Sequence, residues 1–401
     1  MIQTPPSLRY SGRIAALDIA RGIAVLGMFA AHVGPERDGL SGWFLDLADG
    51  RSSILFATLA GVSLAILTGR NVPYTGVEFL QAKVRIFTRA ALLIAISGVL
   101  ALMNDIVALI LTFYATWFVL AISFLQWRPR NLFILAGGCW ILGPIAATYL
   151  NVFFEKAGLY SMGDSSGFLV DTLINGTYVG LVYMGFVFAG LGIGRLDLAD
   201  RSVAATLAPI GSSLAILGYG TAFLLTKMGM GPTWEDYGSS FVDSGDLGWR
   251  MDGMGPEWDP SVSAPSLDMF LGAEPHSGTI LEAIGSGGFA IAITGFLLLG
   301  GPILGKVLYP IASVGSMPLS AYSFHIIAIW AIPALVFPDS FAPLAWLVGA
   351  TLVLCSAWRL VLGRGPLERL LHVASTRASQ ITAPPPYTPL PVAPNGESPR
   401  Q

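Results

Sequence analysis

The chain has 401 residues, of which 54% are hydrophobic and only 12% charged, and its formal net charge is −3. Soluble domains carry about 25% charged residues, so this composition excludes an ordinary soluble protein and indicates an integral membrane protein. Both cysteines, Cys139 and Cys355, lie in apolar segments, which excludes a disulfide framework and a cysteine metal site.

Apolar stretches of about 17 to 25 residues are long enough to cross a bilayer as helices. We therefore predict an all-α, polytopic bundle of about ten transmembrane helices. The predicted segments are 13–33, 51–68, 86–103, 106–126, 131–150, 176–194, 203–226, 279–300, 311–333 and 341–362. The first lacks a small-residue cleavage site and carries two charges, so we interpret it as a retained helix and not as a signal peptide.

Lysine and arginine concentrate in every second loop, which is the pattern that marks the cytoplasmic side. With the N-terminus inside, this alternation predicts that both termini are cytoplasmic. We predict a membrane-embedded domain over 1–372, followed by a proline-rich disordered tail over 373–401. The acidic, aromatic outer loop 227–278 is either a solvated cap or a binding loop for a polar, hydroxyl-rich acceptor.

The first predicted helix carries Asp18, Arg21 and His32. At about 100° per residue these three side chains share one face, and about 21 Å of helix separates the first from the last. Because a charge inside a bilayer costs at least a few kcal/mol, such residues usually face a protein interior or an aqueous cavity. This helix is therefore predicted to present a polar stripe across most of the membrane.

Three histidines fall at the outer level of the membrane, on separate segments. They are His32, His276 and His325, and Glu282 lies at the same level near the start of its span. Histidine is the usual general base near neutral pH, oriented by a carboxylate. We predict that these four residues form one outer catalytic site, with free backbone N–H groups at 277–279 available to an oxyanion.

Arginines gather at the inner ends of the helices. Arg85 and Arg89 lead into the third predicted span and are expected to face Asp18 and Arg21. The planar guanidinium suits phosphate recognition, so these four residues predict a pocket for a phosphate-bearing ligand such as a coenzyme A thioester. Simple positive-inside anchoring with a structural Asp18–Arg21 pair is the alternative. Neither a metal site nor nucleic-acid binding is expected.

Several motifs are similar to those of a known family. They are Leu17-Asp18-Ile-Ala-Arg21-Gly22, Leu55-Phe56-Ala-Thr-Leu-Ala-Gly61-Val-Ser63, Pro275-His276-Ser277-Gly278-Thr279, Gly315-Ser-Met-Pro-Leu-Ser320-Ala-Tyr322 and Gly365-Pro-Leu-Glu368. The pattern over about 9–372 resembles the YeiB-like bacterial membrane proteins, and its opening resembles heparan-α-glucosaminide N-acetyltransferase.

The resemblance implies a multi-pass acyltransferase of the bacterial cytoplasmic membrane. It would take an acyl group, expected to be acetyl, from cytoplasmic acyl-CoA and transfer it to a hydroxyl or amine of an extracytoplasmic sugar or lipid. In that branch the proposed catalytic histidine lies in the loop after the first span, whereas 33–50 here contains none. The assignment of the base to His32 therefore rests on its position on the first helix.

Two other classes of function fit these residues. A transporter or flippase would use Asp18, Arg21 and His32 as a substrate or proton path, although no inverted repeat relates the two halves. A non-catalytic membrane binding partner is the third class. Membrane lipid is an expected partner in every case, and assembly into a homodimer is left open.

Overall fold

The computed structural model describes residues 14–35, 39–103, 106–157, 168–230 and 270–380, and these residues form helices and no strands. The elements are α1 (Ala15–Val33), α2 (Gly39–Ala48), α3 (Arg51–Leu67), α4 (Gly76–Ala101), α5 (Ile110–Leu120), η2 (Ala121–Phe124), α6 (Pro129–Lys156), α7 (Phe168–Val170), η3 (Asp171–Asn175), α8 (Gly180–Gly194), α9 (Arg201–Lys227), α11 (Ile280–Leu299), α12 (Gly301–Val307), α13 (Tyr309–Val314), α14 (Pro318–Ala331), η5 (Pro333–Leu335), α15 (Ala342–Val361) and α16 (Pro366–Ala378).

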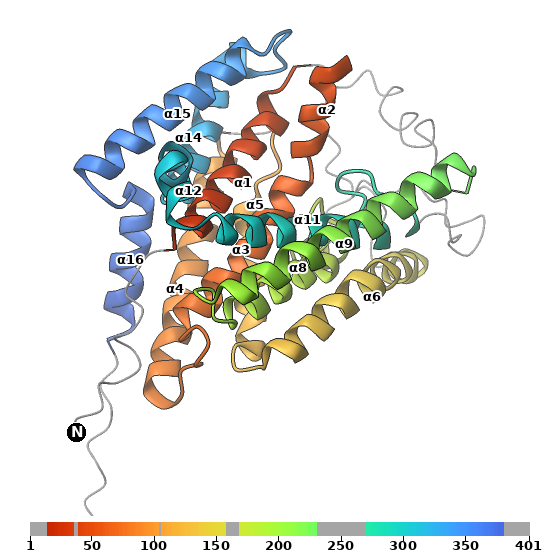
Figure 1. Ribbon diagram of the computed structural model, residues 1–401, viewed down its shortest axis with the longest axis horizontal. Coiled ribbons are helices and arrows are strands. Elements are labelled where there is room, and N and C mark those ends of the chain that lie inside the picture. Colours follow the sequence, from red (N-terminus) through yellow and green to blue (C-terminus); the bar gives the residue numbers. More distant parts are fainter. Residues whose placement is uncertain (1–13, 36–38, 104–105, 158–167, 231–269, 381–401) are drawn as a thin grey trace, which may run out of the picture.

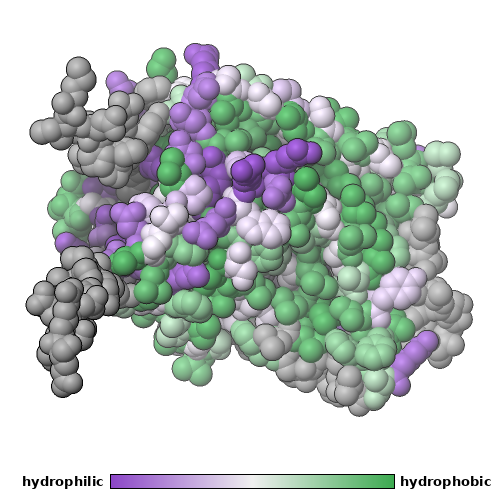
Figure 2. Space-filling model, turned by 90° about the horizontal axis from the view of Figure 1, so that it is seen from below, coloured by the Kyte–Doolittle hydropathy of each residue, from purple (hydrophilic) through white to green (hydrophobic). Residues whose placement is uncertain are grey.

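Seven of the described helices are long and apolar enough to cross a membrane. Three shorter apolar helices, Ile110–Phe124, Gly180–Gly194 and Pro318–Ala331, correspond to the remaining predicted segments. Figure 2 shows that hydrophobic side chains cover most of one face, while hydrophilic side chains gather toward one end. The prediction of an all-α, polytopic membrane protein is confirmed, with seven full-length spans among the ten predicted positions.

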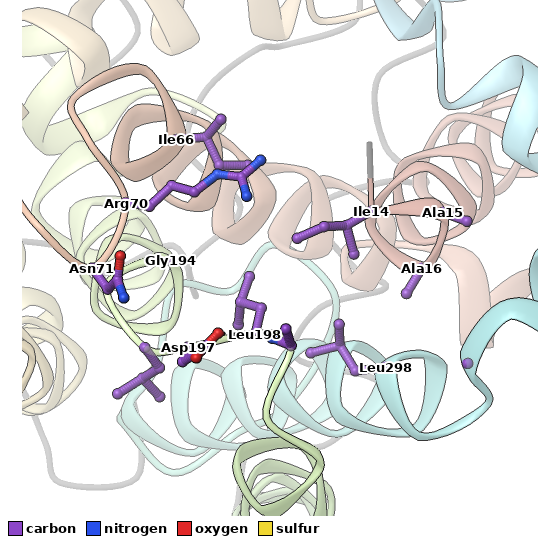
Figure 3. A pocket seen from close by; sticks show the side chains of 13 residues that line it. Ile14, Ala15, Ala16, Ile66, Arg70, Asn71, Gly194, Asp197, Leu198 and Leu298 are labelled. Carbon is purple, nitrogen blue, oxygen red and sulfur yellow. Dashed lines mark hydrogen bonds between the residues drawn. The ribbon is translucent and has the colours of Figure 1, made fainter. Parts of the chain in front are cut away.

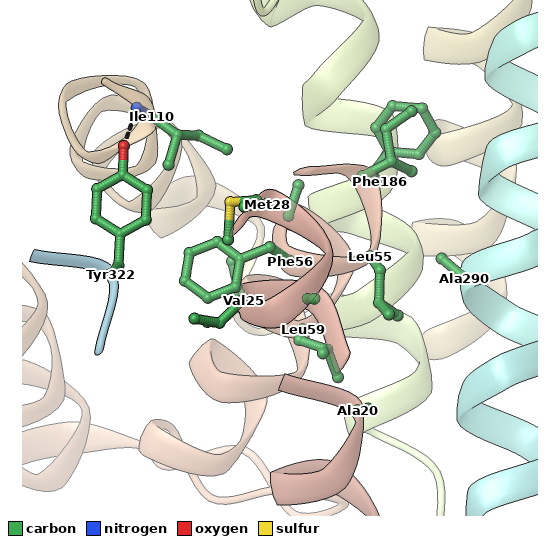
Figure 4. Packing of buried hydrophobic residues seen from close by; sticks show 14 of the residues in the cluster. Ala20, Val25, Met28, Leu55, Phe56, Leu59, Ile110, Phe186, Ala290 and Tyr322 are labelled. Atoms are coloured by element: carbon green, nitrogen blue, oxygen red, sulfur yellow. Dashed lines mark hydrogen bonds between the residues drawn. The ribbon is translucent and has the colours of Figure 1, made fainter. Parts of the chain in front are cut away.

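Helices α1 and α3 form the centre of the bundle (Figure 1). α13, α14 and α15 pack against α1, while α8 packs against α3 and α9 packs along α11. Apolar side chains of α1 and α3 fill the space between these layers, among them Val25, Met28 and Phe56, as Figure 4 shows. The C-terminal helices α13, α14 and α15 thus pack on the side of the core that α1 forms.

Glycines allow two of these contacts to be backbone contacts. A Cβ on Gly190 of α8 would lie 1.7 Å from the carbonyl oxygen of Thr58 on α3. A Cβ on Gly315 would lie 1.7 Å from the carbonyl oxygen of Asp18 on α1. Only glycine permits such a close approach, so α8 and the segment after α13 are held tightly against the central helices.

Two predicted segments differ from the structure. The predicted span 311–333 is broken, because α13 ends at Val314 and α14 begins at Pro318. Gly315 lies in this break, against α1. The third predicted span begins at Gly76 and not at 86, because the helix continues through the charged turns that precede the apolar stretch.

Three other predictions concern the ends and the longest loop. Helix α16 crosses the predicted domain boundary at 372 and ends at Ala378. Most of the predicted outer loop 227–278 and the proline-rich tail beyond 380 lie outside the described residues.

Candidate functional site

His32 and His325 are in direct contact. His32 lies in the last turn of α1 and His325 on α14, and Nδ1 of His32 is 3.0 Å from Nε2 of His325. Their rings are nearly parallel, with centroids 5.3 Å apart. Phe29 stacks on the fully buried His325 ring at a centroid distance of 4.6 Å and so helps to fix its plane.

The hydrogen-bond network determines which ring nitrogens carry protons. Nδ1 of His325 contacts the carbonyl oxygen of Tyr322, and a carbonyl can only accept, so this nitrogen carries the hydrogen. In the neutral ring, Nε2 of His325 is then an acceptor, and Nδ1 of His32 must donate to it. The remaining nitrogen of neutral His32, Nε2, has a lone pair and is able to take a proton.

The third histidine pairs with a carboxylate from the turn before α3. Nε2 of His276 lies 3.5 Å from Oδ1 of Asp49, and both side chains are largely buried. The ring of Tyr178 contacts His276 edge-on at a centroid distance of 5.6 Å. A histidine beside an aspartate is the arrangement that orients and stabilises a charged imidazolium.

Glu282 acts on the backbone near His276. Its carboxylate accepts the N–H groups of His276 at 2.9 Å and Gly278 at 2.7 Å, and its own N–H donates to the hydroxyl of the N-cap residue Thr279. The sequence Thr279-Ile-Leu-Glu282 thus forms a capping-box type of arrangement at the start of α11. The prediction of free N–H groups over 277–279 is wrong for Ser277 and Gly278, because the carbonyl of Glu274 and the carboxylate of Glu282 already accept their hydrogen bonds.

The capping arrangement also holds a strained residue. His276 has a φ of 62°, in the left-handed region that residues other than glycine rarely adopt. Such conformations persist where the surroundings over-determine them, and they cluster at functional sites. The bond from the His276 N–H to Glu282 stabilises this conformation and so aims the ring toward Asp49.

The two histidine pairs lie at the same end of the bundle. His32 is within electrostatic range of both Asp49 and His276. Gly50, beside Asp49, packs against Pro275, beside His276. The structure therefore brings together the three histidines that the sequence singled out, and it adds Asp49 as the carboxylate that faces one of the rings.

A buried ionic group lies further along α1, toward its start. Nη1 of Arg21 is 3.1 Å from Oδ1 of Asp18, and Nη2 of Arg359, on α15, is 3.8 Å from Oδ2. The Asp18 side chain is only 1% exposed, and Nη2 of Arg21 also donates to Ser63 on α3 at 3.1 Å. Two cations thus share one carboxylate. Sequence reasoning missed the role of Arg359, whose only signal was a charge within the last span.

Arg85 and Arg89 have other partners than the sequence suggested. Their Nε atoms contact the hydroxyls of Ser379 and Ser375, at 2.9 and 3.4 Å, where α4 packs against α16. Their hydrogen bonds go to α16 and not to Asp18 or Arg21, because the face of α4 that carries them packs on this C-terminal helix. The four residues predicted to form one phosphate pocket therefore fall into two groups.

A cavity of about 360 Å³ opens between the start of α1 and the ends of α3, α8 and α11 (Figure 3). We call it the inner cavity, after the side that the distribution of positive charge predicts to be cytoplasmic. Its polar lining comes from Arg70, Asn71 and Asp197, and the rest is mainly apolar. Two of its lining residues, Ala15 on α1 and Ile66 on α3, lie one helical turn from Asp18 and Ser63 respectively. The cavity thus lies close to the ionic group, at the end of α1 opposite His32.

The buried Arg195 forms hydrogen bonds to several of the segments around this cavity. Arg195 follows α8 directly, and its guanidinium donates to the carbonyls of Ala65, Arg70 and Leu125 and to the hydroxyl of Thr68. These acceptors come from α3, the loop after it and the end of η2. Arg195 therefore fixes the backbone that presents the Arg70 side chain, a role that was not predicted from its position in the sequence.

The part of the chain that the structure describes contains no cluster of three or more histidine, cysteine or acidic side chains arranged for a metal ion. The cavity and the neighbouring ionic group offer polar side chains that could contact a phosphate-bearing ligand.

The chain matches a known protein family, described as the catalytic domain of heparan-alpha-glucosaminide N-acetyltransferase, over residues 13–224. No curated protein matches the chain. The matched region is just over half of the 401 residues and includes Asp18, Arg21, His32 and Asp49. It confirms the resemblance seen in the opening motif. The chain therefore belongs to the heparan-alpha-glucosaminide N-acetyltransferase catalytic family and is a multi-pass membrane protein of the acetyltransferase type.

Proposed function

We propose that this protein transfers an acyl group, expected to be acetyl, from cytoplasmic acyl-CoA to a hydroxyl or amine of an extracytoplasmic sugar or lipid. The family match supports the class of reaction. The separation of the inner cavity from the outer histidines supports the two-sided arrangement, because donor and acceptor would approach the bundle from opposite ends.

The inner cavity is the proposed entry for the donor. Arg70 would attract the phosphates of the coenzyme, while the apolar lining would accept its less polar parts. Beyond the cavity, Arg21 and Arg359 flank Asp18 and provide a positive region along α1. The thioester arm would extend along this helix toward His32.

The outer histidines would perform the proton transfers. His32 would take the proton of the acceptor hydroxyl or amine on Nε2 as the acceptor oxygen or nitrogen attacks the thioester carbonyl carbon. A new C–O or C–N bond forms, the C–S bond breaks, and the thiolate leaves and is protonated. His276, oriented by Asp49, would when protonated stabilise the developing oxyanion.

The observation that carries this proposal is the His32–His325 contact. It provides a neutral imidazole with a fixed tautomer on the first helix, at the opposite end of α1 from the inner cavity. Histidine with a free lone pair is suited to general-base catalysis near neutral pH.

The test is turnover of acetyl-CoA by the purified full-length protein, with release of the free thiol measured in the presence of glucosamine as a probe acceptor. We expect His32→Ala to abolish thiol release and His276→Ala to reduce it strongly, with both variants folded. Lys227→Gln, an exposed residue at the end of α9, is the matched control and should retain activity. Full activity of a His32→Ala/His276→Ala double variant would contradict the proposal.

The buried ionic group keeps a transporter as the second candidate function. Asp18, Arg21 and Arg359 lie within helices of membrane-spanning length, where ionisable residues often mark a substrate path. Counterflow of a sugar or lipid into liposomes without any thiol release would favour this function over acyl transfer.

A further inference from the structure

Four positive or ionisable side chains gather where α4 packs against α16. They form what we call the α4–α16 basic cluster, and they are Arg85, Arg89, Arg364 and His372. None of them lines the inner cavity, so the cluster is separate from the proposed donor entry. In Figure 1, α16 runs beside α4 at the edge of the bundle.

Serine hydroxyls hold the two arginines of α4 in register with α16. Arg85 donates from Nε to Ser379 at 2.9 Å, and Arg89 donates from Nε to Ser375 at 3.4 Å. Arg85 and Arg89 are four residues apart on α4, and their partners Ser379 and Ser375 are also four residues apart. The two contacts are therefore separated by about one helical turn. A guanidinium has five N–H donors, and each bond uses only Nε. The terminal nitrogens of both arginines therefore remain available to another ligand.

Among the described residues, no carboxylate forms an ion pair with Arg85, Arg89 or Arg364. The nearest acidic residue of α16 along the chain, Glu368, bonds instead to the backbone of Leu319 and Ser320. Slight burial, together with Arg364, Arg89 and Arg85, lowers the pKa of His372. The cluster is thus a region of uncompensated positive charge, with its two α4 arginines partly buried.

We propose that the α4–α16 basic cluster binds a phosphate-bearing anion. Two half-buried guanidiniums one helical turn apart can each offer two parallel N–H groups to phosphate oxygens, which is the geometry in which arginine binds phosphate best. The exposed Arg364 and His372 complete the positive region. The anion compensates the charge between the two helices and so stabilises the docking of α16 on α4.

Two sources present this phosphate chemistry at the inner surface. One is the headgroup of an anionic lipid, and the other is a phosphate of coenzyme A. The proposal does not depend on acyl transfer, because the lipid can bind whether or not the protein is an enzyme.

The test measures binding of two probes to the full-length protein in a neutral detergent. The probes are dioctanoyl phosphatidylglycerol and coenzyme A, the latter compared with its analogue that lacks the 3′-phosphate. The variant is Arg85→Gln/Arg89→Gln. The matched control is Arg128→Gln/Arg130→Gln, which removes the same charge from exposed positions before and at the start of α6.

We expect at least one probe to bind tenfold or more weakly to Arg85→Gln/Arg89→Gln, while the control binds as the wild type does. Loss for the lipid alone identifies the headgroup, and loss for coenzyme A alone identifies the coenzyme. Equal binding by the two double variants would overturn the proposal, since the effect would then reflect only the general charge of this surface.

A second measurement protects the test against misfolding of the variant. Addition of the bound probe to the wild type should raise the pKa of His372, followed by NMR of its imidazole and assigned with His372→Gln. A pKa of His372 that stays constant at saturating probe would overturn the proposal. The variant Arg85→Lys/Arg89→Lys keeps the charge without the planar fork, and should bind with intermediate affinity.

Discussion

His32 and His325 lie 293 residues apart in the chain, and their ring nitrogens are 3.0 Å apart in the fold. The carbonyl of Tyr322 requires the hydrogen of His325 to be on Nδ1, so Nε2 of His325 accepts and Nδ1 of His32 carries a hydrogen. The backbone of α14 therefore sets the protonation pattern of a side chain on α1.

The first prediction concerns His325 as a positioning residue. His325→Phe fills the ring volume but cannot accept the hydrogen bond from His32, so the rate constant for acyl transfer should fall about 100-fold, at the lower end of general-base contributions. KM should change little, and His325→Gln, whose side-chain oxygen can accept, should recover part of the rate. Unchanged kcat and an unchanged pH profile in His325→Phe would contradict this role.

The second prediction concerns Asp49. Asp49→Asn keeps an oxygen for the Gly50 N–H, which Asp49 accepts at 3.0 Å, but removes the charge that faces His276. We expect a rate loss of about 100-fold with little change in thermal stability, because the packing is preserved. Asp46→Asn, three residues earlier on α2, is the control. A similar loss in both variants would mean that the effect is not specific to the His276 pair.

The third prediction concerns the buried ionic group. Removal of one partner of a buried pair typically costs about 3–5 kcal/mol. Asp18→Leu should be the most damaging single change, because it leaves both Arg21 and Arg359 without their shared carboxylate. Arg21→Leu still leaves Asp18 beside Arg359 and should be milder. The midpoints of thermal unfolding in detergent would give this order, and a reversed order would refute the shared-carboxylate arrangement.

The fourth prediction concerns pH and Glu368. Its carboxylate caps the start of α14, since it accepts the N–H of Leu319 at 2.8 Å and of Ser320 at 3.0 Å. Burial raises the pKa of Glu368 even though these hydrogen bonds act in the opposite direction. A raised folded-state pKa means that its contribution to stability is full below the unfolded pKa and is lost as pH rises through the folded pKa.

Glu368→Gln remains neutral throughout this range and provides the comparison. The unfolding midpoint of the wild type relative to Glu368→Gln should therefore fall as pH rises above about 4.3, the ordinary glutamate value. The control is Glu78→Gln, at an exposed position in the first turn of α4, and it should show no such trend. A wild-type advantage that increases with pH would be the contrary result.

The fifth prediction concerns topology, which still rests on the distribution of positive charge. A cysteine at position 228, just after α9, should react with an impermeant reagent in sealed cells. A cysteine at position 130, near the start of α6, should react only after permeabilisation. Labelling of position 130 in sealed cells would reverse the assignment of inner and outer ends.

The sequence predicted the helical segments well because the bilayer imposes a length and an apolar composition on each of them. The level of the histidines could also be predicted, because rise per residue fixes how far along a span each one lies. The break between α13 and α14 was missed although Pro318, at the first position of α14, is a local signal for the end of the preceding helix. The close approach of Gly315 to the Asp18 carbonyl could not be predicted, because it is a contact between distant segments.

The partners of the charged residues were harder to predict for the same reason. Helical spacing predicted the Asp18–Arg21 pair, because the two residues are close in the sequence. It did not predict that Arg359 contacts Asp18, or that Arg85 and Arg89 bond to α16. These contacts depend on which helix faces which, and positive-inside counting says only at which surface a charge lies. Glu282 was recognised as important, but its capping role was missed although Thr279-x-x-Glu282 carries the signature.

The contact between Asp18 and Arg359 has a consequence for biosynthesis. The two residues are 341 positions apart, from 359 minus 18, so at about 5–20 residues per second a ribosome needs roughly 20 to 70 s to make the second after the first. During that interval α1 has entered the membrane with Arg21 beside the Asp18 carboxylate, and Ser63 of α3 later accepts a hydrogen bond from Arg21. The nascent first helix therefore has to wait, in the insertion machinery or against α3, until one of the last helices of the chain completes its polar contacts.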